Sequence, residues 1–148
     1  MLIGGRGNDR VSDLDLDDSG GLVLGGVTDS SDFPVENAFQ SKLAGNNDGF
    51  VARLSTSTWN ISFATYVGGS QLDAIWGGRA HSAGKIVVSG SSESNDLRTL
   101  QRISARPSAK SAAFVASMTS DGQQPGWLSF YAGTGETYGG GMELDQGG

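Results

Sequence analysis

Four aspartates near the start of the chain are the first candidates for metal chemistry. Asp13, Asp15, Asp17 and Asp18 stand close together, and calcium prefers six to eight oxygen ligands. A helix-flanked calcium loop that began at Asp13 would need Gly at its sixth place and Glu at its twelfth. Those places hold Asp18 and Leu24. On a strand, residues 13, 15 and 17 would share one face, where like charges repel. A calcium site, pairing with a basic side chain and simple solvation are therefore the alternatives for this run.

Three tryptophans and one histidine are the other candidates. Trp59 and Trp76 could stack on sugar rings, whereas Trp127 matches Phe63 in the repeat described below and is expected to pack in the core. His81 has no serine and aspartate in the order or spacing of a catalytic triad. The spacings of phosphate-binding and dinucleotide-binding loops also fail. The sequence therefore predicts no enzymatic activity, and calcium is the one cofactor it leaves open.

These candidate residues lie within an internal sequence repeat. When the chain is shifted by 64 places against itself, 14 of the 84 overlapping positions are identical, and seven of these are Gly. The stronger signal is the Phe-Val-Ala triplet at residues 50–52, which recurs at 114–116. The same shift aligns Asp15 with Arg79, and Arg79 with Glu143. Alternating charges on neighbouring strands then predict ion pairs between Asp15 and Arg79 and between Arg79 and Glu143.

Each repeat contains four short runs typical of β-strands, with apolar, β-branched or aromatic residues bounded by Gly, Asp and Ser clusters. Strands are expected at residues 11–17, 22–28, 50–54 and 61–67, and again at 74–80, 85–92, 113–118 and 126–131. A third copy of the first strand is expected at 138–145. Four antiparallel strands are the unit of a β-propeller blade. The fold prediction is therefore all-β and propeller-like, with two four-stranded antiparallel blades (1–68 and 69–132) and the first strand of a third (133–148).

Several short motifs of the first repeat carry a family resemblance. They are Asp-Asp-Ser-Gly at 17–20, Gly-Val-Thr at 26–28, Asp-Phe-Pro at 32–34, Ala-Phe-Gln at 38–40, Asp-Gly-Phe-Val-Ala-Arg-Leu at 48–54 and Thr-Tyr-Val-Gly-Gly-Ser at 65–70. Together they resemble the bacterial SBBP repeat, a β-propeller repeat. The second repeat departs from this pattern, because Leu97-Arg98 replaces Phe-Pro and Ala112 replaces Asp48. The resemblance implies an extracellular or cell-surface protein without catalytic activity.

The amino-acid composition excludes or disfavours several further classes of protein. The 148 residues include 24 Gly, which disfavours helices and favours many short strands joined by turns. The net charge of −6, with no basic stripe, argues against nucleic-acid binding. The absence of Cys excludes a disulfide framework and a thiolate zinc site. No apolar run approaches the ~18 residues of a membrane span, and the first residues lack a signal-peptide pattern.

The blade number bears on function. Propellers typically contain 4–8 blades, so two blades and part of a third do not close a ring. A fragment of a longer protein, a ring or fibre of identical subunits, and an open stack all remain open. We predict a non-catalytic extracellular scaffold with a structural or adhesive role, whose partners are proteins or further copies of itself. A carbohydrate-binding propeller that uses Trp59 and Trp76, or an accessory domain of a longer secreted protein, is the alternative.

Overall fold

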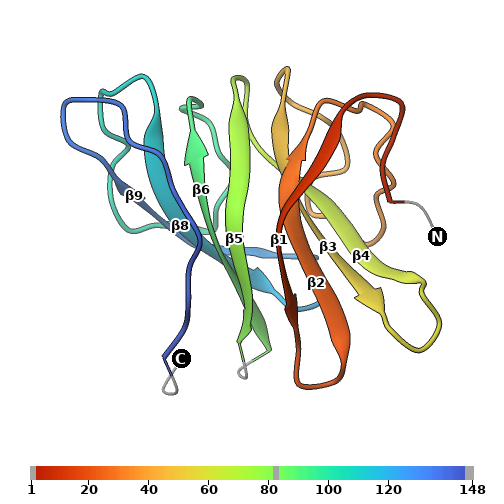
Figure 1. The fold of residues 1–148 in the computed structure, drawn as a ribbon. Helices are drawn as coiled ribbons and strands as arrows, with labels where there is room; N and C mark the ends of the chain where they lie inside the picture. Colours follow the sequence, from red (N-terminus) through yellow and green to blue (C-terminus); the bar gives the residue numbers. More distant parts are fainter. Residues whose placement is uncertain (1–2, 82–83, 146–148) are drawn as a thin grey trace.

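The protein consists of two β-sheets that lie side by side (Figure 1). The computed structural model describes residues 3–81 and 84–145, and these contain nine strands and no helix. The first sheet has the order β1-β2-β3-β4, formed by Asp9–Leu16, Gly21–Thr28, Asp48–Ser55 and Ile61–Val67. The second has the order β5-β6-β8-β9-β7, formed by Asp73–His81, Lys85–Ser92, Ala112–Thr119, Pro125–Tyr131 and Gln101–Arg102. No described segment forms a helix of the length and apolarity that a membrane crossing needs.

Eight of the expected strands are confirmed, and the ninth is wrong. The strands of the first sheet and β5, β6, β8 and β9 lie where the alternating patterns predict them. Residues 138–145 form no strand; they contact the second sheet through Glu143, Gly139 and the Gly140 carbonyl, without a ladder of backbone hydrogen bonds. The second sheet nevertheless has five strands, because the two residues of β7 pair in parallel with β9. The loop that supplies β7 is the one whose sequence departs from the first repeat.

Strand pairing repeats with the period seen in the sequence. Asp9 pairs with Thr28 in the first sheet, and Asp73 pairs with Ser92, each 64 residues further on, in the second. The first strand of each sheet, which faces the neighbouring sheet and is called its inner strand, is β1 or β5. Both inner strands contain a bulge at the matching place, at Ser12 in β1 and between Ile75 and Gly77 in β5. The two sheets therefore have the same local structure in their first strands, including the bulge.

The turns that enter the two sheets are fixed by matching aspartates. The backbone N–H of Gly5 donates to Asp9 at 2.8 Å, and that of Gly69 donates to Asp73 at 2.7 Å. A serine hydroxyl, from residue 30 or residue 94, donates to the same carboxylate oxygen in each sheet. A side chain at either glycine would overlap that serine. The Gly-Gly and Asp that recur in the sequence thus form the same turn at the start of each sheet.

One face of the first sheet packs against the second sheet. This face carries Val23, Val51 and Phe63 and is called the forward face of the first sheet. Strand β5 crosses it, and its Ile75 side chain is fully buried above Gly25 and Gly49, where a Cβ would crowd it. Because these glycines lack side chains, the inner strand of the second sheet can approach the first sheet closely.

The opposite face of the first sheet carries Leu24, Phe50 and Tyr66 and is called its rear face. Loop 29–48 covers part of it, and the ring of Phe33 lies 4.6 Å from that of Phe50. Phe39, from the same loop, packs against the apolar layer between the sheets. The loop aromatics therefore fold back onto the sheets, where their burial is favourable.

Candidate functional site

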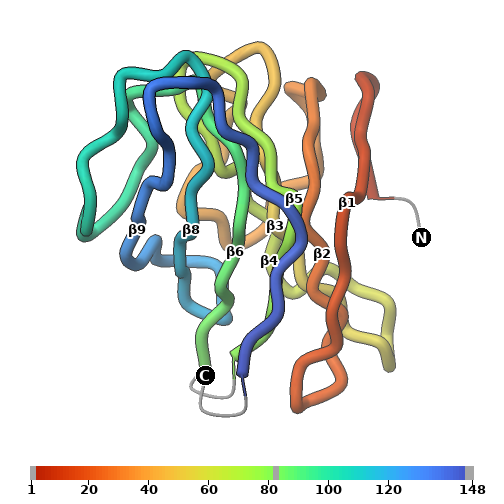
Figure 2. The backbone as a smooth tube through the Cα atoms, turned by 60° about the vertical axis from the view of Figure 1, so that its left-hand side comes forward, coloured from red at the N-terminus to blue at the C-terminus, as the bar shows by residue number. Residues whose placement is uncertain are grey.

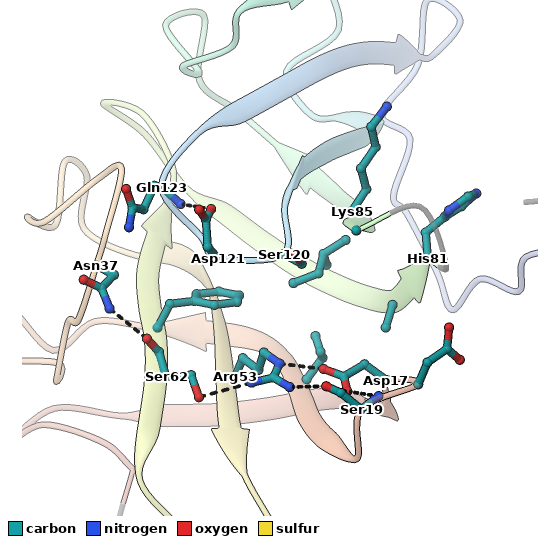
Figure 3. Close-up of a pocket in the computed structure, with 16 residues that line it drawn as sticks. Asp17, Ser19, Asn37, Arg53, Ser62, His81, Lys85, Ser120, Asp121 and Gln123 are labelled. Atoms are coloured by element: carbon teal, nitrogen blue, oxygen red, sulfur yellow. Dashed lines mark hydrogen bonds and ion pairs between the residues drawn. The ribbon is translucent and has the colours of Figure 1, made fainter.

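A pocket of about 420 Å³ opens between the two sheets (Figure 3). Its apolar floor contains Val23 and Phe63 from the first sheet and Ile86 from the second. Its walls are the β1–β2, β5–β6 and β8–β9 hairpin ends, together with Asn37 of loop 29–48. The joint between the two sheets thus creates a concave surface that neither sheet has alone.

Arg53 on β3 is the polar centre of this pocket. Its guanidinium donates to Asp17 at 2.5 Å, to the hydroxyl of Ser19 at 2.8 Å and to the hydroxyl of Ser62 at 3.2 Å. The hydrogen bond from Arg53 is the largest influence on Asp17 and holds the pKa of its carboxyl well below the usual value. A side chain at Gly21 would overlap the guanidinium. The arginine is therefore held rigidly as part of the pocket wall.

Charges of both signs surround the pocket rim. Lys85 is exposed and His81 is half-buried, and both side chains point away from Arg53 in Figure 3. Asp18 is also exposed and lines the pocket. Asp121 accepts hydrogen bonds from the Thr119 hydroxyl and the Gln123 N–H, which lower the pKa of its carboxyl. An apolar floor with hydroxyl, amide and carboxylate groups around it can hold a small polar molecule through directed hydrogen bonds.

A second charged cluster joins β1, β5 and the segment after β9. Arg79 contacts Asp13 at 2.6 Å and forms a two-pronged pair with Glu143 at 2.7 and 3.1 Å. The structure therefore contains the expected pair of Arg79 with Glu143. The expected pair with Asp15 is absent, because Asp15 accepts the backbone N–H of Ala80 at 3.0 Å and Asp13 lies beside the guanidinium instead.

The cluster shifts the pKa of each of its members toward the charged form. The hydrogen bond with Glu143 is the largest cause of the raised pKa of Arg79, and the same bond lowers the pKa of Glu143. Burial alone would raise the pKa of Asp13, but hydrogen bonds from the Gly78 N–H and from Arg79 outweigh it and lower the pKa. All three groups therefore carry their charges at neutral pH.

The acidic run has a structural explanation in this arrangement. Strand β5 lies at the edge of its sheet, so part of its backbone N–H groups lack a ladder partner. Asp13 and Asp15 accept two of them, from Gly78 and Ala80. Asp17 closes the hairpin turn instead. Across residues 3–81 and 84–145, no three His, Cys, Asp or Glu side chains are grouped so that they could hold a metal ion. The geometry thus does not assemble the calcium site considered for residues 13, 15, 17 and 18.

The tryptophans lie outside the pocket. Trp59 is exposed on the β3–β4 turn, and Trp76 occupies the β5 bulge, where its indole N–H donates to Ser91 at 2.7 Å. Neither lines the pocket. Trp127 is half-buried, so the expectation that it packs in the core is wrong, and its neighbour Leu128 is the buried residue. The reason is that its side of the second sheet has no further sheet packed on it.

Comparison with known proteins assigns this chain to no family. The chain matches no protein-family model, and a search of curated proteins found no match. The class that the structure itself defines is an all-β protein of two packed sheets with a pocket at their joint.

Sequence reasoning missed the pocket and its central arginine. A signal was present, because Arg53 stands between the buried residues Ala52 and Leu54 of an apolar strand. A charge in such a place requires a partner. The partner's identity depends on the β1–β2 turn, which brings Asp17 across strand β2 to reach the guanidinium.

Proposed function

We propose that this chain is a propeller-like repeat module that acts as a non-catalytic structural or adhesive scaffold outside the cell or at its surface. The observation that supports it is the repeated joint between inner strands. β5 runs along β1, and residues 137–145 run along β5 beside the second sheet (Figure 2). The carbonyl of Gly140 accepts the hydroxyl of Ser89, and Glu143 pairs with Arg79.

Successive sheets stacked through one kind of joint are the arrangement of repeat proteins, whose stability is a sum of module and nearest-neighbour terms. A blade array of this kind needs no reactive centre to function, because its loops and faces offer extended contact surfaces. The extracellular location rests on the resemblance of the first repeat to the SBBP pattern.

The test is a lengthened chain in which residues 1–68 are followed by residues 5–148. This keeps the period and places a second copy of the first sheet between the two native sheets. Nearest-neighbour stacking predicts that the melting temperature rises by several degrees and that unfolding stays a single cooperative transition. A melting temperature equal to or below that of the natural chain, or a separate early transition, would contradict the stacking arrangement.

A second candidate function, carbohydrate binding, is favoured by the pocket rather than by the tryptophans. Its apolar floor and ring of hydroxyl and carboxylate groups suit a polar, partly apolar ligand. A glycan array followed by calorimetric titration tests it. Binding that is lost in Asp18→Ala, at the pocket rim, and kept in Trp59→Ala would support the pocket as the sugar site. Binding lost only in the Trp59 variant would place the sugar elsewhere, and no binding at all would end this candidate.

A further inference from the structure

Equivalent positions of the two sheets differ sharply in exposure. On β1, Val11, Leu14 and Leu16 are 44, 58 and 62% exposed. They share the rear face of the first sheet, since Leu14 and Leu16 pair with residues of its apolar layer. In the second sheet the place of Val11 is held by Ile75, which is fully buried against the forward face of the first sheet. The first sheet thus exposes the apolar strip that the second sheet buries.

The second sheet leaves part of the complementary surface uncovered. Its forward face carries Val87, Val115, Trp127 and Tyr131, which occupy the places of Val23, Val51, Phe63 and Val67 in the first sheet. In the first sheet these four residues are all buried. In the second sheet Tyr131 is 58% exposed, Trp127 and Val115 are half-buried, and Val87 is buried. The chain therefore presents, at opposite ends, the two halves of the joint that it forms internally.

The inner part of that forward face is occupied by a short copy of β1. Residues 142–145 read Met-Glu-Leu-Asp, and residues 14–17, at and just after the end of β1, read Leu-Asp-Leu-Asp at the matching places of the repeat. The copy and the residues before it contact the second sheet through the pair of Glu143 with Arg79, the hydrogen bond from the Ser89 hydroxyl to the Gly140 carbonyl, and the close approach of Gly139 to Gly90. The β1 strand of another molecule carries the same pattern, with Asp15 at the place of Glu143.

We infer that a second copy of this chain docks head to tail, with the rear face of its first sheet on the forward face of the second sheet. In the joint, the incoming β1 replaces residues 142–145, and its Asp15 takes over the pair with Arg79. This arrangement repeats the internal joint in apolar character and in the place of its inner strand, and it repeats the pair of Arg79 with Glu143 in charge. It rests on the proposed function, since it extends stacked modules from one chain to several. Because the two surfaces differ, the assembly grows by one surface binding the other rather than by a symmetric pair.

The first experiment measures the mass of the full chain by sedimentation over a wide range of concentrations. The expected result is a concentration-dependent series at multiples of the 15.3 kDa chain. A chain that stays monomeric at every concentration overturns the inference.

Substitutions on the two surfaces then test which faces meet. Leu16→Lys and Tyr131→Lys each change an exposed residue, so both variants should keep the native circular dichroism spectrum. Each is expected to weaken self-association by about tenfold or more, since it places a charge in an apolar joint. Leu100→Lys is the matched control, because Leu100 is 71% exposed in a loop outside both faces and its substitution should change nothing.

Mixing the two surface variants gives the sharpest result. Leu16→Lys keeps an intact forward face and Tyr131→Lys keeps an intact rear face, so an equimolar mixture should form dimers and nothing larger. Failure of the mixture to dimerise, or equal weakening in the Leu100 control, overturns the head-to-tail arrangement.

Releasing the copy of β1 tests the replacement step. Glu143→Arg removes the pair with Arg79 and should strengthen association several-fold relative to Glu136→Arg, which makes the same charge change in the same segment. Equal association of these two variants overturns the replacement of residues 142–145. The outcome is separable from the proposed function: if the lengthened chain is stabilised but no variant associates, stacking within one chain stands and docking between chains fails.

Discussion

The joint between the sheets can be probed at a single glycine. Gly122, in the β8–β9 turn, has a φ of 72° and lies against the buried ring of Phe63. A methyl group at residue 122 would overlap that ring. Gly20 has nearly the same backbone conformation, with a φ of 77°, but its nearest atom is the Thr56 hydroxyl oxygen at 3.7 Å from the added carbon. Gly20→Ala is therefore a control for backbone strain, and Gly122→Ala adds the overlap with the other sheet.

The two effects have different sizes. An L-residue in the left-handed conformation costs roughly 1–2 kcal/mol, which is the full expected cost of Gly20→Ala. Overpacking of a filled core adds about 1–3 kcal/mol, so Gly122→Ala should cost roughly 2–5 kcal/mol in total. For a chain of this size, the extra 1–3 kcal/mol corresponds to a melting temperature roughly 2–12 °C below that of the Gly20 variant.

Thermal unfolding followed by circular dichroism, with urea unfolding as a second measure, provides the comparison. The double variant Gly122→Ala with Phe63→Leu should recover part of the loss, because the shorter side chain removes the overlap. Equal melting temperatures of the Gly122 and Gly20 variants would refute the packing of the β8–β9 turn on Phe63. Strictly additive losses in the double variant would do the same.

Three further predictions concern buried polar groups. The hydrogen bond from Arg53 lowers the pKa of Asp17. The ionised Asp17 should therefore stabilise the fold above its unfolded-state pKa of 3.8, and this stabilisation should be lost as pH falls. The free energies of unfolding of Asp17→Asn and wild type, measured in urea, should accordingly approach each other between about pH 5 and about pH 2. Burial raises the pKa of Asp73, so wild type should lose stability as pH rises above the unfolded value of 3.8 and through the raised value, and Asp73→Asn should gain stability relative to wild type over that range; a constant difference between the two would contradict it. Tyr66→Phe removes the hydroxyl that accepts the Phe33 N–H, which should cost about 1–3 kcal/mol of unfolding free energy; a loss below ~0.5 kcal/mol would show that this buried hydrogen bond contributes little.

Local patterns were enough to predict most of the strands. Residues 61–67 alternate apolar and polar or small side chains, and β4 has the same limits. The failure at 138–145 is equally instructive, because that segment has the pattern of an inner strand but no neighbouring strand to pair with. A strand is a property of two segments, so pattern alone cannot predict one whose partner is absent.

The candidate site was much less predictable. The alignment of charges at 64-residue spacing correctly placed Glu143 beside Arg79. It chose Asp15 over Asp13, because the alignment does not show how far one inner strand is displaced along the next. That displacement determines which carboxylate faces the guanidinium and which faces a backbone N–H. The pocket around Arg53 depends on three hairpin ends and on loop 29–48, which come together only after the sheets pack.

The amino-acid sequence by itself determined the all-β class, the period of 64 residues and the turns built from glycine and aspartate, since these depend on backbone sterics and on contacts between residues near in sequence. The packing of one sheet on another decided which apolar face is buried, which carboxylate pairs with Arg79 and where a pocket opens. These outcomes depend on distances between segments far apart along the chain, and those distances are set by side-chain volumes at the joint, down to the missing side chains of two glycines beneath Ile75.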